Sequence, residues 1–590
     1  MTINQAETSL FPFSGQKGSQ KPDNRQLNMK TKSTGEGLRG LALLMSFLLI
    51  VAGVKPSTLL AADWHTLVQP IGTENTPYLL EPATLNASYA TGKGPWELST
   101  TVTSTRTTVP QFFVRFYNPT ATSNASGQEG SWVMRASSVR GLNAQQIRNL
   151  FALPNTPTMM TLGQSVSGES FYTGLAGTIV GWGDGGGQQF QSSGTPYTIF
   201  FNGQAVMDAV LSYPAMATTD NGRALGTYLV AHTPLPYSDM ETLYNSLDVL
   251  CNPATQELFN SALNSVSPQR FDNLATSGYH AVAMQDQAID DRIDRLVLNQ
   301  SRSGLWAKAA RTFQKNPASG FDGDINAIIV GADKKSSDNS ISGLSLAWMH
   351  GTVDWYDGGG QAVTEYYRLG AYSALFLDNA FLQALVSVGS TDGKTLRNIN
   401  IATYYQPSVH GPALSPLTAL SRTAKATHKG WDADIALRSG LLLHAGPINL
   451  LPGFGLGYLY QSRNRFNETG AESLDLTVDA AHTQTFHSQA NLRIDREFLL
   501  NDHKKITPYI IVGWDYAKRL DAQAVTASMN GWTESFTTSS SSLSDTQSLT
   551  GSIGVEMALS KALFIHADYS RQALADDRQS GFGLAMNYEF

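Results

Sequence analysis

The sequence is short of cysteine and of charged residues. Its 590 residues include one cysteine, Cys251, and only 15% of them are charged. A single cysteine excludes an internal disulfide framework and a zinc cluster made of cysteines, so Cys251 is interpreted as a small buried hydrophobe rather than a reactive thiol. The net charge of -7 gives no reason to expect a nucleic acid as partner. Low charge with 52 glycines is typical of an exported bacterial β-protein.

Long hydrophobic runs are also missing. The longest apolar run, 41–54, is too short to span a bilayer comfortably, since a helix needs about 20 apolar residues to do so. It follows the basic residues Lys30, Lys32 and Arg39 and leads to small residues at Ala61 and Ala62. This order predicts a secretory signal over 1–62, with Met29 as an alternative start, and a transmembrane anchor is the competing interpretation.

Recognisable catalytic motifs are absent as well. The glycines at 185–187 are followed by two glutamines instead of the Lys and Ser or Thr of a phosphate-binding loop. The segment 163–167 lacks the closing glycine of a nucleophile elbow. His65, His232 and His280 have no matching acidic partner at a useful spacing. We therefore assign no catalytic, cofactor-binding or metal-ligating residue and expect neither an enzyme nor a cofactor.

The last ten residues show what the chain does contain. Phe582, Leu584, Met586, Tyr588 and Phe590 share one parity, and small or polar residues fill the other. This two-residue period over about ten residues is what a transmembrane β-strand needs to cross the hydrocarbon at a tilt. Strand edges cannot stay unpaired in lipid, so the pattern demands enough further strands to close a barrel.

Eleven more segments of this kind precede it. The twelve candidate strands are 304–313, 323–333, 340–351, 362–375, 380–391, 429–443, 448–461, 482–499, 506–517, 547–559, 562–571 and 580–590. Short connections alternate with longer ones, and 392–428, 464–481 and 521–546 are the longest. Short periplasmic turns and long outer loops are typical of outer-membrane barrels, whereas a soluble β-sandwich would not require this alternation. The predicted fold class is an all-β transmembrane barrel of 12 antiparallel strands with an internal α-helix.

Two regions lie between the signal and the barrel. Residues 63–215 are rich in Thr, Ser, Gly and Pro with short β-like runs, which predicts a short β-rich domain. Residues 216–302 have apolar residues at three- and four-residue spacings, which predicts helices. The last helix is either an amphipathic helix packed on its neighbours or a helix threaded through a polar pore just before the barrel, 303–590.

Charged residues in this helix and in the strands are the candidate site. The candidates on the pore helix are Asp286, Asp290, Arg292, Asp294 and Arg295. Four strand residues opposite in parity to the outward-facing ones are the lumen candidates: Tyr366, Arg368, Asp515 and Glu556. These two sets either pair with each other or stay solvated in the lumen.

Several motifs follow one another along the chain: Gly304-Leu305-Trp306, Asp333 with Ser337-Asp338-Asn339, Gly358-Gly359-Gly360, Tyr367-Arg368-Leu369-Gly370-Ala371-Tyr372 and the terminal Tyr588-Glu589-Phe590, with a lead-in at Asn221-Gly222-Arg223-Ala224 and Ser267-Pro268-Gln269-Arg270-Phe271. In these motifs and their order, the chain resembles the translocator domain of classical, monomeric (type Va) autotransporters. This resemblance covers roughly the last 290 positions. It implies a helix-filled barrel that helps bring an N-terminal passenger, here 63–215, to the cell surface. It also implies that the barrel-assembly machinery reads the last strand, with Tyr588 and Phe590 as the assembly signal.

The resemblance sets the functional expectation. Self-cleaving members carry paired asparagines in the pore helix, whereas this chain has Asn299-Gln300, so we expect the passenger to stay attached. We expect an outer-membrane autotransporter whose passenger binds an unknown extracellular ligand, as an adhesin, with outer-membrane lipid and the barrel-assembly machinery as partners and no nucleic acid. The alternatives are an enzymatic or toxin-like passenger, and a porin-like barrel with a periplasmic N-terminal domain.

Overall fold

The computed structural model describes most of the chain beyond its N-terminal region. The described residues are 78–119, 127–194, 197–298, 303–501, 504–521, 524–539, 545–573 and 578–590. The expected signal, 1–62, and Asn299-Gln300 lie outside them. Within this part of the chain, no helix is both long and apolar enough to cross a membrane.

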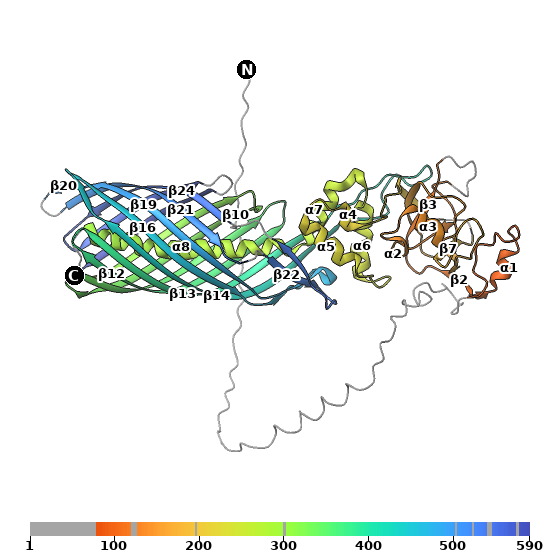
Figure 1. Cartoon of the computed structure of the whole chain (residues 1–590), viewed down its shortest axis with the longest axis horizontal. Helices are drawn as coiled ribbons and strands as arrows, with labels where there is room; N and C mark the ends of the chain where they lie inside the picture. The colour runs from red at the N-terminus through yellow and green to blue at the C-terminus, as the bar shows by residue number, and fades with distance from the viewer. Residues whose placement is uncertain are drawn as a thin grey trace, which may run out of the picture. The chain divides into compact units, whose positions relative to one another are not determined.

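A closed ring of twelve antiparallel strands forms the C-terminal half (Figure 1). In order around the ring, the strands are β9 (Gly304–Asn316), β10 (Phe321–Ser337), β11 (Ser340–Trp355), β12 (Gly360–Leu377), β13 (Ala380–Ile401), β14 (Leu420–Leu441), β16 (Ile448–Arg463), β19 (Ala481–Arg496), β21 (Lys504–Arg519), β24 (Asp545–Ala558), β25 (Leu563–Ala573) and β26 (Arg578–Glu589). Strand β26 pairs with β9, with Leu584 opposite Ala309, so the ring has no open edge. The prediction of a twelve-stranded transmembrane barrel is confirmed.

The two-residue period sorts each strand into a lipid face and a lumen face. On β26, the Met586 side chain is 52% exposed, whereas its neighbours Ala585 and Asn587 are buried. The same alternation leaves Ile510 and Val512 of β21 exposed on the outside. Apolar side chains meet hydrocarbon there, while every backbone group is paired within the sheet, which is the condition for crossing a membrane.

Strands β13 and β14 are longer than the sequence predicted. Each has 22 residues, about twice what the hydrocarbon requires, so their far ends project beyond the bilayer. The loops expected at 464–481 and 521–546 also contain short strands: β17 (Phe466–Asn467), β18 (Leu476–Val478), β22 (Ala524–Met529) and β23 (Phe536–Ser539). These four pair into a separate sheet, called the loop sheet below. These extensions carry polar residues on both faces, so the apolar alternation expected for lipid contact did not predict them.

Inside the barrel runs α8 (Asn273–Leu298), the predicted pore helix (Figure 1). Its apolar side packs on inward-facing residues of the first strands, where Ile289 and Ile293 share a core with Trp306, Ile329 and Tyr372. The rest of its surface is polar and faces charged residues of the barrel wall. The helix therefore fills one side of the lumen by apolar packing and meets the other side by charge.

The four helices directly before α8 form the helical module, residues 213–272. They are α4 (Tyr213–Met216), α5 (Asp220–Val230), α6 (Asp239–Leu250) and α7 (Gln256–Val266), and the 3-10 turns η3 (Pro253–Thr255) and η4 (Pro268–Asp272) flank α7. The side chains of Thr219 and Ser238 cap α5 and α6 by accepting hydrogen bonds from the backbone N–H groups of Gly222 and Glu241. The module shares one core with the projecting strand ends and the loop sheet; Leu225 and Leu263 belong to the same cluster as Ile399 of β13.

The N-terminal region is built from two small antiparallel sheets. Its elements are β1 (Tyr78–Leu80), α1 (Pro82–Asn86), β2 (Val102–Arg106), β3 (Phe112–Tyr117), β4 (Trp132–Val133), α2 (Ala136–Val139), α3 (Ala144–Leu150), β5 (Met159–Gln164), β6 (Ser170–Leu175), β7 (Gln188–Ser192) and β8 (Ile199–Ala205). One sheet has the order β1-β2-β6-β7-β4 and the other β3-β5-β8. Phe113, Phe171 and Phe190 pack together between strands of the two sheets.

Candidate functional site: the barrel lumen and its helix

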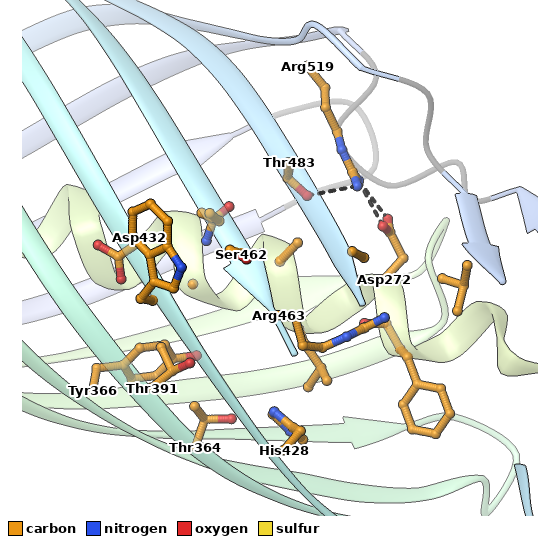
Figure 2. A pocket seen from close by; sticks show the side chains of 18 of the residues that line it. Asp272, Thr364, Tyr366, Thr391, His428, Asp432, Ser462, Arg463, Thr483 and Arg519 are labelled. Carbon is orange, nitrogen blue, oxygen red and sulfur yellow. Dashed lines mark hydrogen bonds and ion pairs between the residues drawn. The ribbon is translucent and has the colours of Figure 1, made fainter. Parts of the chain in front are cut away.

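The outer end of the lumen is where the chain passes from η4 into α8. Figure 2 shows Arg519 of β21 reaching both Asp272 and Thr483, with Nη1 2.9 Å from a carboxylate oxygen of Asp272 and Nη2 3.1 Å from the threonine hydroxyl. Arg463 of β16 donates to the backbone oxygen of Phe271 at 3.0 Å. Two arginines from the barrel wall therefore fix the point at which the chain enters the lumen.

The inner end of α8 is held by a network of buried charges. Arg292 donates to both carboxylate oxygens of Asp333 on β10, each at 2.8 Å, and lies 3.3 Å from Glu589 of β26. The hydroxyl of Tyr372 also donates to Asp333, at 3.0 Å. Arg295 pairs with Glu589 at 2.8 Å and with Glu556 at 3.0 Å. Glu556, a lumen candidate, therefore meets the pore helix.

The same inner part of α8 also meets charged and polar residues of the opposite wall. Asp294 pairs with Arg438 of β14 at 2.6 Å. Asp290 accepts hydrogen bonds from Gln383 at 2.7 Å and from Gln489 at 2.9 Å. Charged groups in this polar lumen are satisfied mainly by one another, which fixes the rotation and height of the helix.

The remaining candidates lie nearer the outer half of the lumen. Tyr366 donates to the hydroxyl of Ser277 on α8 at 3.1 Å. Arg368 bonds Asp432 of β14 and also donates to Gln285 of α8 at 2.7 Å. Asp286 and Asp515 line a lumen cavity of about 220 Å³.

Several lumen residues escaped the sequence prediction. They are Lys308, Asp333, Asp432 and Arg438, each charged, buried and on the inward parity of its strand. Lys308 bridges Asp291 of α8, at 2.6 Å, and Asp568 of β25, at 3.5 Å. The available signal was a charged residue inside an alternating apolar strand.

Outside the membrane, an arginine in a buried ion pair of the barrel also contacts the helical module. Arg397 of β13 is fully buried and makes a two-pronged contact with Glu468, with nitrogen to oxygen distances of 2.8 and 2.5 Å. It also donates to the backbone oxygens of Ser265, at 2.9 Å, and Leu474, at 2.8 Å. One side chain thus connects α7, a barrel strand and the 464–480 connection.

Two groups of the helical module, the Cys251 thiol and the Asp239 carboxylate, have shifted pKa values. Cys251 is buried, and burial raises the pKa of its thiol, in agreement with its interpretation as a small hydrophobe. Asp239 at the start of α6 accepts from Arg422 of β14 at 2.6 Å and from the backbone N–H of Ser473 at 3.0 Å. The hydrogen bonds from Arg422 hold the pKa of Asp239 well below its usual range.

We expect Asp239→Asn to weaken this attachment by roughly 1 kcal/mol, because the pair is partly exposed. Since the pKa of Asp239 is lowered in the folded state, the wild-type stabilisation is present above the unfolded pKa of about 3.9 and is lost as pH falls further. Limited proteolysis of the helical module at pH 7 and pH 3 measures both effects. Asp220→Asn, in an exposed pair with Arg223, is the control. Equal cleavage rates of Asp239→Asn and wild type at pH 7 would contradict this account.

The C-terminal barrel is similar to a known protein family. A family model described as the autotransporter beta-domain matches residues 305–570, which confirms the resemblance expected from the sequence. A comparison with curated proteins gives no match.

Three solved structures illustrate the similarity. The translocator domain of the autotransporter NalP from Neisseria meningitidis is 16% identical, with a TM-score of 0.41, over 53% of this chain and 98% of that one. The beta domain of the Bordetella autotransporter BrkA is 17% identical, with a TM-score of 0.35, over 49% of this chain and 100% of that one. The transport unit of AIDA-I from Escherichia coli is 13% identical, with a TM-score of 0.33, over 49% of this chain and 91% of that one.

Proposed function

Because the chain belongs to the autotransporters through its C-terminal β-domain, which is a barrel of the outer membrane, we propose that the barrel presents residues 63–215 as an uncleaved passenger at the cell surface. The barrel itself is a translocator and not an enzyme. The passenger acts by binding, as an adhesin for an extracellular ligand, and not by catalysis. Its proposed partners are outer-membrane lipid and the barrel-assembly machinery, and no nucleic acid.

One observation carries the proposal: the helical module has a common core with the outer strand ends. Leu263 of α7 belongs to the same buried cluster as Ile399 of β13 and Leu476 of β18. Arg397 adds a buried ion pair across the same junction. A segment that only passed through during export would not need such a core, so this packing supports a passenger held at the barrel's outer end.

The contacts that hold α8 are a second support for an attached passenger. The helix is paired at its inner end through Arg292 and Arg295, and the chain leading to it is held at Asp272. If the passenger were cut off at the helix, these contacts would hold a helix that no longer leads to a domain at the cell surface. They therefore favour a passenger that stays joined to the barrel.

A surface turn of the passenger supports a binding role. The side chain of Val180 is 87% exposed, and the neighbouring Trp182 lies under the ammonium of Lys93, which is 4.7 Å from the ring centroid. Lys93 also donates to the backbone oxygen of Val180 at 3.1 Å, which holds the turn in place. An ordered turn that presents apolar groups to solvent is suited to contact another surface.

The last strand supports the proposed assembly partner. Tyr588 lies on the outward parity of β26 and Phe590 directly follows the strand; both are at least half exposed, and their ring centroids are 6.5 Å apart. Strand β26 closes the barrel against β9, so it is the last pairing the chain can make in sequence order. These features suit a strand that the outer-membrane insertion machinery recognises before the barrel closes.

Protease treatment of intact cells tests surface display. An epitope tag is inserted within 120–126 of one variant and at Asp338, in the short β10–β11 turn, of a second variant. We expect protease to remove the first tag and leave a membrane-bound barrel, and to spare the second tag until the outer membrane is permeabilised. Heated gel samples of untreated cells should show one band that contains both the first tag and the barrel.

Two results would contradict the proposal. If the tag within 120–126 is protected until permeabilisation, the passenger is periplasmic and the porin-like alternative holds. If untreated cells contain a separate barrel band without the tag, the passenger is cleaved after export. Binding to host cells or matrix proteins, compared between whole cells and cells shaved of the passenger, then tests adhesion.

A further inference from the structure

Three side chains from three different elements meet in the lumen. They are Asp286 of α8, Asp434 of β14 and His487 of β19, and their ligand atoms all lie within 4.8 Å of one another. The Nε2 atom of His487 is 3.1 Å from an oxygen of Asp434. Two carboxylates with one imidazole are a donor set that suits a divalent ion such as Zn²⁺.

Two oxygens of this group are buried without a hydrogen-bond partner. They are Oδ1 of Asp286 and Oδ2 of Asp434, and the side chain of Asp434 is fully buried. Arg368 of β12 directs its nitrogens to Gln285, Asp432 and Ser387 instead. Buried charges are ordinarily paired or coordinate a metal, so these oxygens point to a cation that the side chains do not supply.

In a neighbouring cluster, a lysine side chain and not an ion balances the negative charge. Asp291, His566 and Asp568 also bring their ligand atoms together, but Lys308 lies among them. Its ammonium is 2.6 Å from Asp291 and 3.5 Å from Asp568. In that cluster a lysine provides the positive charge, whereas Asp286 and Asp434 form no ion pair with a lysine or arginine of the described residues.

The wall is shaped to receive the imidazole. His487 pairs across the sheet with Gly457 of β16, and a Cβ atom at 457 would lie 2.2 Å from two ring atoms of the histidine. Any larger residue at 457 would therefore displace the ring from its position beside Asp434. Asp286 and His487 also line the lumen cavity of about 220 Å³, which has room for water to complete a coordination shell.

We propose that Asp286, Asp434 and His487 form a divalent-metal site of the zinc class that joins the pore helix to two barrel strands. The ion supplies the positive charge that balances the two carboxylates. It also links α8 to the barrel wall. It binds the helix-filled barrel in preference to any state in which the helix has left the lumen. The metal therefore stabilises the filled barrel by mass action.

The test uses the full-length protein in detergent after dialysis against a chelator. Calorimetric titration should show that Zn²⁺ binds the protein. Bound Zn²⁺ should also raise the thermal unfolding temperature of the barrel. Asp286→Asn, Asp434→Asn and His487→Gln should each weaken this site by more than about tenfold, since loss of even an outer-shell partner has that effect. His482→Gln removes an exposed histidine from the same strand and should leave the site unchanged.

Cobalt provides a second readout that does not depend on stability. Co²⁺ bound by this set should give a visible absorption band that is lost in His487→Gln and kept in His482→Gln. Equal Zn²⁺ affinity in wild type and all three site variants would overturn the proposal. It would also be overturned if Zn²⁺ had no effect on wild type while Asp434→Asn raised the unfolding temperature, because the two carboxylates would then share a proton.

Discussion

Arg292→Met should lower the free energy of unfolding of the barrel by about 3–5 kcal/mol, the range observed when one partner of a buried ion pair is removed. The guanidinium is almost completely buried and is shared by Asp333, at 2.8 Å, and Glu589, at 3.3 Å. Methionine keeps an unbranched apolar stem but has no charge, so it leaves the carboxylates of Asp333 and Glu589 in a poorly solvated site without the guanidinium. The loss should therefore be electrostatic rather than a packing defect.

Urea unfolding of the purified protein in lipid vesicles, followed by the heat-dependent mobility of the barrel on gels, measures the change. Lys335→Met is the matched control, because Lys335 faces Asp338 at 3.8 Å in an exposed pair, where the expected change is at most about 1 kcal/mol. Arg292→Lys should recover only part of the stability, since one ammonium cannot make the same fork toward Asp333. A loss below 1 kcal/mol in Arg292→Met would mean that water reaches this site.

The barrel could be predicted because lipid imposes a simple rule on its strands. Residues such as Val512 and Met586 must be apolar where they meet hydrocarbon, and the next residue along the strand need not be. The rule applied to all twelve strands, and their number and order follow from it. The alternation ends where a strand leaves the bilayer, so the predicted end of the fifth strand at 391 falls short of the observed end of β13 at Ile401.

Packing outside the membrane could not be predicted in the same way. The apolar spacing of α5 and α7 shows that each helix has a buried face, but it does not say what covers that face. Arg397 meets Glu468 and the backbone of Ser265, which are 71 and 132 residues away in the chain. Contacts at such separations depend on the register and tilt of the barrel, which local patterns do not contain.

The contacts inside the lumen could be predicted only in part. Parity identified Glu556 and Arg368 as inward-facing, and charge identified Arg295 and Asp290 on the helix. Which of them meet depends on the height of each residue along the barrel axis, which the stagger of the strands determines. Asp290 consequently bonds Gln383 and Gln489, two neutral residues that charge patterning alone does not select.

Arg397→Met should detach the helical module from the barrel at a cost of about 3–5 kcal/mol. The substitution leaves Glu468 fully buried without its cation and removes donors from the carbonyls of Ser265 and Leu474. The membrane-embedded strands do not depend on these contacts. Limited proteolysis should therefore cut residues 213–272 quickly, while the barrel fragment keeps its heat-dependent mobility.

The double variant Arg397→Met/Glu468→Met separates charge from packing. Replacing both members of a buried ion pair by apolar residues of similar volume is often neutral, so most of the lost protease resistance should return. If it does, the single variant fails because a carboxylate is stranded, and the shared apolar core is sufficient to hold the module in place. If the double variant is cleaved as fast as the single one, the hydrogen bonds from Arg397 to the backbone of α7 hold the module against the barrel. The packing of the module on the barrel then depends on this one side chain.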